Sequence, residues 1–130
     1  EERIIITINN AESSIDAAIY SFTSEKIATS LISANNRGIR VRVITDYLQS
    51  ASRNSKDEFL EDKIEIRVMP SKNTMHNKFM VIDNELVITG SYNWTKNGNT
   101  KNFENIAFIF DQELADKYRE EFFELWVKAN

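Results

Sequence analysis

The residues best suited to chemistry lie in one stretch, Met75–Trp94, which contains the single histidine of this 130-residue chain. His76 and Lys78 are two residues apart, so on a strand their side chains would point to the same face of the sheet. An imidazole can act as a nucleophile or as an acid and base near neutral pH, while an ammonium group binds the nonbridging oxygens of a phosphate. The pair therefore indicates phosphate chemistry rather than a metal site.

Further hydrogen-bonding side chains follow on the next predicted strand. Ser91 and Asn93 are again two residues apart, and a hairpin would bring them to the same end of the sheet as the histidine and lysine. Taken singly, these residues also have structural explanations. Asp83 lies in the predicted turn, where aspartate is favoured, and the aromatic residues Tyr92, Trp94 and Phe103 suit packing. The conjunction of all four side chains is what indicates a site.

The composition excludes several other chemistries. With no cysteine the chain has no disulfide framework, thiolate metal site or thiol nucleophile. With one histidine it cannot supply a metal site that needs two histidines from a single chain. The three glycines, Gly38, Gly90 and Gly98, lie too far apart for a dinucleotide-binding or Walker-type phosphate loop. No apolar run approaches the roughly 18 residues of a membrane span.

The charge of the chain is unevenly distributed. The formal net charge is −4, but five basic and two acidic residues between Arg67 and Lys101 give that segment +3. The rest of the chain then carries −7. A basic segment in an acidic protein predicts a local anion-binding site.

The elements that must position these residues are those of one α/β domain. Residues 3–11 fit either a helical stripe or a β-branched strand, and we favour a helix. A strand at Ser14–Phe22, a helix capped by Ser24 and ending near Asn36, and a strand at Ile39–Asp46 form a βαβ unit, so these strands should be parallel.

The strands near the end of the chain, beginning with the hairpin after Lys78, are expected to be antiparallel. We expect a short helix within Gln49–Asp62, strands at Ile64–Met69, Lys78–Ile82, Leu86–Thr89 and Ile106–Phe110, and a final helix capped by Asp111. The predicted fold is therefore α/β, with a mixed parallel and antiparallel sheet and helices packed on both faces.

The pattern HxK, four residues, D, six residues, GSxN resembles the HKD motif of the phospholipase D superfamily. Its places are filled by His76, Lys78, Asp83, Gly90, Ser91 and Asn93. IYSFTS at Ile19–Ser24 and VRVITD at Val41–Asp46 are similar to the family's opening βαβ unit. SYNWT at Ser91–Thr95 and NFEN at Asn102–Asn105 resemble its small bacterial endonuclease branch, which includes mitochondrial relatives. The resemblance implies a single phospholipase D-like domain over residues 1–130.

Two departures from the family pattern affect what the resemblance implies. Family members have a strand ahead of the first helix, and this chain starts too late to contain it. Together with a first residue that is not Met, this indicates a mature or trimmed form. The chain also has one HKD motif, whereas larger members carry two. The resemblance therefore implies a homodimer whose subunits share one site on a twofold axis.

The resemblance also implies a mechanism without metal or cofactor. His76 of one subunit would attack phosphorus, and His76 of the other would protonate the leaving oxygen and then activate water. Lys78, with Asn93 and Ser91, would bind the nonbridging oxygens. Glu104 would orient a histidine ring. Asp83 and Gly90 would be structural members of the motif.

The sequence leaves open whether the substrate is a nucleic acid or a lipid. We favour a nonspecific endonuclease acting on DNA or RNA. Its backbone contacts would include Lys72, Lys96, Lys101, Asn73 and Asn97, and Tyr92 or Trp94 could stack on a base if exposed. A phospholipase acting on cardiolipin or another phospholipid is the alternative, although the sequence shows no basic amphipathic helix or exposed aromatic anchor.

Two further functions are compatible with the sequence. The domain could be the nuclease module of a larger restriction-type enzyme. A catalytically dead binding module is disfavoured by the intact set of catalytic residues. The chain resembles bacterial proteins, and it fits either a cytoplasmic location or export after loss of an N-terminal signal.

Overall fold

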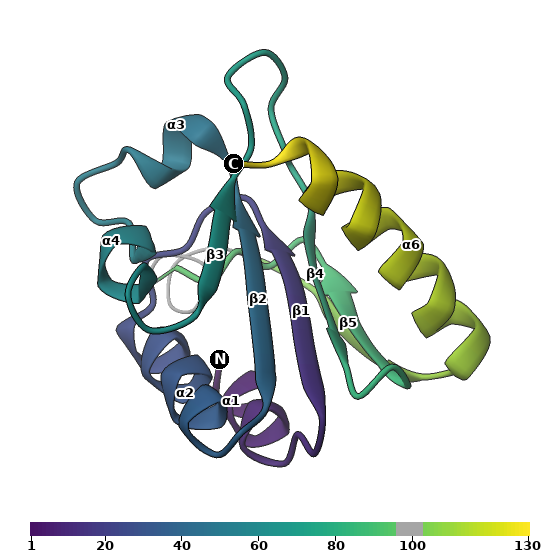
Figure 1. Cartoon of the computed structure of the whole chain (residues 1–130). Coiled ribbons are helices and arrows are strands. Elements are labelled where there is room, and N and C mark those ends of the chain that lie inside the picture. Colours follow the sequence, from purple (N-terminus) through teal and green to yellow (C-terminus); the bar gives the residue numbers. More distant parts are fainter. Residues whose placement is uncertain (96–102) are drawn as a thin grey trace.

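The computed structural model describes residues 1–95 and 103–130. In this part of the chain six strands form one sheet with the order β3-β2-β1-β4-β5-β6. Strands β1, β2 and β3 are mutually parallel, while β4 pairs antiparallel with β1, β5 with β4, and β6 with β5. Helices α1 and α2 cover one face of the sheet and α6 covers the other (Figure 1). The predicted mixed α/β fold is confirmed.

The first part of the chain forms the predicted βαβ unit after a leading helix. Helix α1 (Glu2–Asn9) buries Ile4 and Ile8, which confirms the helical interpretation of residues 3–11. Strand β1 (Ser14–Ile19), helix α2 (Glu25–Asn36) and strand β2 (Arg40–Thr45) follow. The Ser24 hydroxyl oxygen accepts a hydrogen bond from the Ile27 N–H at 3.2 Å, and so caps α2 as predicted.

The polar segment Gln49–Asp62 contains the predicted short helix with loose flanks, and a further helical turn that overlaps its start was not predicted. The structure has two helical turns, α3 (Tyr47–Ser50) and α4 (Asp57–Leu60). Asp46 caps α3 early, because its carboxylate accepts from the N–H groups of the second and third helical residues. The residues between the two helices are rich in serine and have no apolar stripe to bury, so their side chains compete with helical hydrogen bonds. Strand β3 (Glu65–Val68) follows.

The remaining elements match the predicted ones closely. Strands β4 (Lys78–Ile82) and β5 (Leu86–Gly90) form the expected hairpin, and β6 (Ile106–Phe110) adds to β5. Helix α6 (Gln112–Lys128) starts at the predicted cap, where the Asp111 carboxylate accepts from the Leu114 N–H at 2.9 Å. These elements hold the sheet end at which the candidate residues meet.

Two hydrophobic cores hold the helices on the sheet. Alternate residues of β1 point to opposite faces, so Ile15 and Ile19 pack with α1 and α2 while Ala18 packs with α6. All six residues of the central strand β1 are buried, so both of its faces are covered. The positions of the strand ends are therefore fixed from both faces of the sheet.

Candidate active site

The candidate residues meet at one end of the sheet. β1 finishes there, β4 starts there, β5 finishes there, and the residues before β6 return there (Figure 1). His76 lies just ahead of β4 rather than on it, since the strand starts at Lys78. The backbone pairing nevertheless continues past the strand, because the Tyr20 N–H donates to the Asn77 carbonyl oxygen at 2.8 Å. This bond fixes the backbone next to the histidine.

His76 and Lys78 are in direct contact, as their spacing predicted. The Lys78 Nζ atom lies 2.9 Å from His76 Nδ1 and donates to the His76 carbonyl oxygen at 2.8 Å. The same Nζ atom lies 3.5 Å from His76 Nε2, and an ammonium group can donate to whichever ring nitrogen carries no proton. The imidazole is exposed to solvent, whereas Lys78 is half-buried. A nucleophilic ring and a cation thus share one solvent-accessible position.

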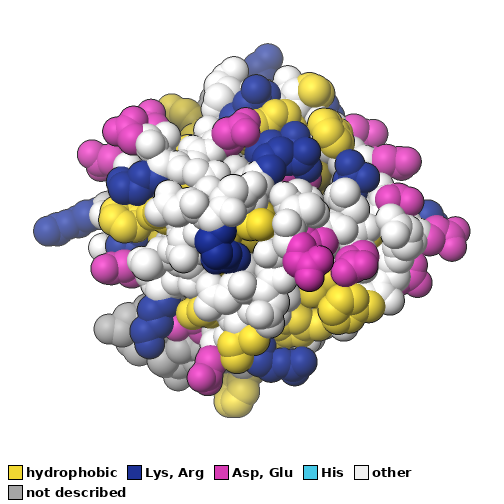
Figure 2. Space-filling model, turned by 60° about the horizontal axis from the view of Figure 1, so that its bottom comes forward, with side chains coloured by type: hydrophobic (Ala, Val, Ile, Leu, Met, Phe, Trp, Pro, Cys, Tyr) yellow, Lys and Arg dark blue, Asp and Glu magenta, His cyan; other side chains and the backbone are white. Residues whose placement is uncertain are grey.

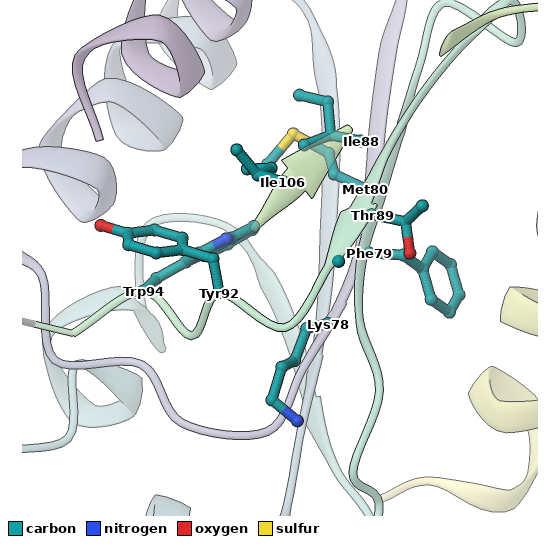
Figure 3. A pocket seen from close by; sticks show the side chains of 9 residues that line it. Lys78, Phe79, Met80, Ile88, Thr89, Tyr92, Trp94 and Ile106 are labelled. Carbon is teal, nitrogen blue, oxygen red and sulfur yellow. The ribbon is translucent and has the colours of Figure 1, made fainter. Parts of the chain in front are cut away.

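The surroundings of Lys78 shift the pKa of its ammonium group. Burial lowers the pKa of the Lys78 ammonium below its ordinary value, and the negative charge of Glu104 opposes this by raising it. Figure 3 shows the Lys78 side chain at one end of a narrow pocket, pointing away from the apolar residues Met80 and Ile88. The lysine is therefore a cation whose nearby acid helps it to keep its proton.

Ser91 and Glu104 are joined across the ends of β5 and β6. The Ser91 hydroxyl donates to the Glu104 carboxylate, and the same oxygen accepts from the Asn105 N–H at 3.1 Å. Gly90 permits this approach: it has a φ of 151°, and a Cβ atom there would lie 2.3 Å from the Asn105 carbonyl oxygen. Glu104 thus lies near Lys78, while none of its described hydrogen bonds reaches the His76 ring.

Asn93 is oriented by the segment that follows β1. Its Oδ1 atom accepts from the Ser21 N–H at 3.1 Å. Because this bond occupies the carbonyl side of the amide, the NH₂ group is the side left to donate to an anion. Ser21 directly follows Tyr20, whose ring contacts His76. The structure therefore brings Asn93 close to the histidine through the end of β1.

The two aromatic residues proposed to stack on bases are core residues. Trp94 and Tyr92 are 3% and 8% exposed, and Trp94 packs edge-on against Phe22 with ring centroids 5.0 Å apart. The Trp94 carbonyl oxygen also accepts from the N–H groups of Thr23 and Ser24. The expectation of base stacking is wrong for both residues, because this segment packs against the residues that lead into α2.

Phe103 differs from its expected role as a packing aromatic, because it is fully exposed beside Glu104. The sequence therefore missed one exposed aromatic side chain next to the site. Of the proposed backbone contacts, Lys72 and Asn73 are exposed on the segment ahead of His76. Lys96, Lys101 and Asn97 lie outside the described residues.

The surface away from the site has no single sign of charge. Figure 2 brings the opposite end of the sheet forward, and there basic and acidic side chains are interspersed with some hydrophobic ones. Among residues 1–95 and 103–130, no group of three or more His, Cys, Asp or Glu side chains is placed to hold a metal ion. Nor does any helix within these ranges have the length and apolarity to cross a membrane.

Asp83 lies at the far end of β4, away from the histidine. Its carboxylate accepts hydrogen bonds from the N–H groups of Glu12, Ser13 and Ser14 at 2.7–3.1 Å and from the Ser13 hydroxyl. Burial acts to raise the pKa of Asp83, but these bonds outweigh it and hold the pKa below its ordinary value. With a φ of 54° the residue also forms the turn. This geometry supports a structural role.

Asp83→Asn is expected to lower the free energy of unfolding at pH 7 by about 1–2 kcal/mol, since the charge-assisted bonds are lost while Asn tolerates the turn. The depressed pKa stabilises the fold above the unfolded value of about 3.9, so the difference from wild type should close as the pH falls through the folded-state pKa. Urea unfolding at several pH values measures this difference in the free energy of unfolding, and Asp62→Asn, at an exposed position, is the control. A loss of kcat at unchanged stability would contradict the structural role.

The comparisons with known proteins agree with this geometry. Residues 4–126 match the family model described as "Cardiolipin synthase, PLD-like domain". The chain belongs to the phospholipase D superfamily. Among solved structures, Nuc of Salmonella typhimurium, a phospholipase D family member, is 30% identical with a TM-score of 0.92, covering 99% of this chain and 88% of its own. NucT from Helicobacter pylori is 27% identical with a TM-score of 0.91.

Curated relatives carry lipid names. The mitochondrial cardiolipin hydrolase of Chlamydomonas reinhardtii is 31% identical over 95% of this chain, and phospholipase D of Rickettsia prowazekii is 34% identical over 98%. The chain spans 56% and 62% of the lengths of these two relatives. Membership of the phospholipase D superfamily shows that the domain is a phosphodiesterase, but it does not decide whether the substrate is a nucleic acid or a lipid.

Proposed function

We propose that this domain hydrolyses phosphodiester bonds of nucleic acids, without a metal ion, in a homodimer with one shared site. The observation that carries the proposal is the contact between His76 and Lys78, a nucleophile and a cation 2.9 Å apart at the open end of the sheet. Ser91, Asn93 and Glu104 surround the same sheet end. This set can attack phosphorus and bind the oxygens around it.

The reaction takes two displacements. A nitrogen of His76 attacks phosphorus, the N–P bond forms, and the bond from phosphorus to the leaving oxygen breaks. His76 of the partner subunit donates its proton to that oxygen. It then takes a proton from water, whose oxygen attacks the phosphohistidine, and the N–P bond breaks to release the phosphomonoester.

The remaining side chains stabilise charge and position. The Lys78 ammonium and the Asn93 NH₂ group would donate to the nonbridging oxygens, on which negative charge grows in the transition state. Ser91 is already engaged with Glu104, so it would position that carboxylate as well as donate to the phosphate. Glu104 would support the cation next to it and orient a histidine ring.

The homodimer follows from the histidine count. The two displacements use one histidine as nucleophile and a second as acid, and the chain has one. A twofold axis next to the exposed His76 ring would bring two copies together. The reaction would then use one ring as nucleophile and the other as acid.

Two observations favour nucleic acid as the substrate. The SYNWT and NFEN segments resemble the small bacterial endonuclease branch, and Nuc matches over most of both chains. Lys72 is exposed four residues ahead of His76, and we expect it to contact a neighbouring backbone phosphate. A nuclease module of a larger restriction-type enzyme would use the same site.

A lipid phosphodiester is the second candidate. It is favoured by the curated relatives named cardiolipin hydrolase and by the exposed Phe103 beside Glu104, an aromatic side chain of the type that inserts at membrane interfaces. The chemistry at phosphorus would be the same. The two candidates differ in what binds the remainder of the substrate.

A side-by-side assay in excess EDTA tests the proposal. Single- and double-stranded DNA, RNA and cardiolipin vesicles are offered to the same preparation, and its mass is measured by light scattering. We expect cleavage of the nucleic acids by a particle of twice the chain mass. Cleavage of cardiolipin alone would replace the substrate, loss of all activity in EDTA would contradict the metal-free reaction, and an active monomer would contradict the shared site.

The lysine also predicts a pH dependence. Protonated Lys78 is required, so kcat/KM should fall at high pH as this ammonium loses its proton. Glu104→Gln removes the charge that raises the pKa of Lys78, so this fall should move to lower pH. Lys78→Arg, whose guanidinium keeps its proton, should abolish the fall of kcat/KM at high pH. Rates on bis(p-nitrophenyl) phosphate from pH 7 to 11 measure the profile, and an unmoved fall in Glu104→Gln would contradict this assignment.

A further inference from the structure

Tyr20 is a side chain next to the histidine to which neither the sequence nor the comparisons assign a role. It directly follows β1 and is half-buried. Its ring lies against the His76 imidazole, with centroids 4.5 Å apart and planes inclined by 46°. The Lys78 Nζ atom lies 5.3 Å from the centre of the same ring. One aromatic face thus touches both groups of the proposed reaction.

The ring is itself held at its far end. The Tyr20 hydroxyl accepts a hydrogen bond from Gln49 Nε2 at 3.2 Å, and Gln49 belongs to α3. At the backbone, the Tyr20 N–H donates to the carbonyl oxygen of Asn77, the residue after the histidine. The ring therefore has little freedom to turn away from His76.

Asp46, the residue that caps α3, binds both the backbone of Gln49 and the backbone ahead of His76. Asp46, only 3% exposed, uses one carboxylate oxygen to accept from the Gln49 N–H at 3.3 Å. Its other oxygen accepts from the Met75 N–H at 2.9 Å. The backbone on both sides of His76 and the face of its ring are thus tied to the ends of β1 and β2.

This support matters because the imidazole is exposed. An exposed side chain samples several staggered rotamers, whereas attack on phosphorus needs one of them. An aromatic ring in contact with the imidazole favours the rotamer that touches it, and a displacement of about 1 Å can cost about a hundredfold in rate.

We propose that Tyr20 is a positioning residue for His76: its ring holds the imidazole in the orientation required for attack. The inference rests on the proposed function for its kinetic consequence, but its structural part concerns the histidine ring alone. The ring, and not the hydroxyl, contacts the imidazole, so Tyr20→Phe retains the support and Tyr20→Leu removes it.

The kinetic test compares Tyr20→Leu with Tyr20→Phe and with Tyr47→Leu, a matched change at an exposed tyrosine of the neighbouring α3. We expect Tyr20→Leu to lower kcat by about ten- to a hundredfold at nearly unchanged KM. Tyr20→Phe should stay within about threefold of wild type, and adding Gln49→Leu to it should cost nothing further because both act through one bond. Wild-type kcat in Tyr20→Leu would overturn the proposal.

The second readout does not depend on activity. The chain has one histidine, so the imidazole signals of histidine-labelled protein are assigned without ambiguity in a ¹H–¹³C spectrum. We expect ring-current shifts in the wild type, Tyr20→Phe and Tyr47→Leu, and their loss in Tyr20→Leu. Unchanged signals in Tyr20→Leu would overturn the proposal. If the wild type hydrolysed no phosphodiester, the proposed function would fail, while these spectra would still decide whether Tyr20 holds the ring.

Discussion

His76→Asn is expected to abolish turnover, with a loss of about 10⁴-fold or more in kcat. Asparagine is similar in size to histidine and keeps a hydrogen-bonding side chain, but its amide nitrogen cannot form the covalent phosphoenzyme. Since His76 is exposed, the free energy of unfolding should stay within about 0.5 kcal/mol of wild type. Rates on a fluorogenic phosphodiester, trapping of labelled phosphoenzyme and thermal unfolding measure the three quantities.

The same substitution tests whether the site is shared. A heterodimer of wild-type and His76→Asn chains, isolated through two different affinity tags, has one histidine at the axis. Because the proposed reaction uses both rings, this heterodimer should be inactive. Half of the wild-type activity would instead show that each subunit works alone, and activity of the His76→Asn homodimer near that of wild type would remove His76 as nucleophile. Thr74→Ala, at an exposed position on the same segment, serves as control.

Local patterns were enough to predict most of the fold. The alternation of apolar residues gave β4 and β5, the caps Ser24 and Asp111 gave the starts of α2 and α6, and the stripe through Ile4 and Ile8 gave α1. The helical turn α3 was not predicted, because a polar segment with no apolar stripe has no periodicity from which a helix can be placed.

Contacts between distant segments were not predictable in this way. Asp16 on β1 and Arg42 on β2 form a buried bidentate pair, with Nε–Oδ1 at 2.7 Å and Nη2–Oδ2 at 2.9 Å. Strand alternation alone would suggest two solvated charges. The pair is buried because the parallel register places the two residues side by side and the aromatic rings of α6 cover the guanidinium.

In the candidate site, too, local spacing predicts some contacts, whereas contacts between distant segments were missed. The pair His76 and Lys78 was found from its spacing, because residues two apart at a strand end share a face. Tyr20 and Gln49 were missed because they are 29 residues apart and meet only after β1 and β2 pair in parallel. The exposure of Phe103 and the burial of Trp94 depend on which segments cover them, which the aromatic residue types do not specify.

Lys78→Met is expected to lower kcat by about 10³-fold on every phosphodiester that the protein cleaves, because the methionine chain fills the space of the lysine stem and supplies no charge to the phosphoryl oxygens. Lys72→Met should behave differently. Lys72 is exposed and would contact a remote backbone phosphate, so its loss should weaken binding of DNA and lower the salt dependence of KM by about one charge. Its kcat, and its rate on bis(p-nitrophenyl) phosphate, should not change.

The small substrate separates the two lysines, since it offers a reacting phosphate and no neighbouring one. A cation that stabilises the transition state must matter equally for bis(p-nitrophenyl) phosphate and for DNA, whereas a cation that holds the polymer must matter only for DNA. Lys117→Met, at an exposed position on α6, controls for the loss of one charge. If Lys78→Met raised KM for DNA and left hydrolysis of the small substrate intact, Lys78 would be a binding residue and the charge at phosphorus would have to be stabilised by Asn93 and its neighbours.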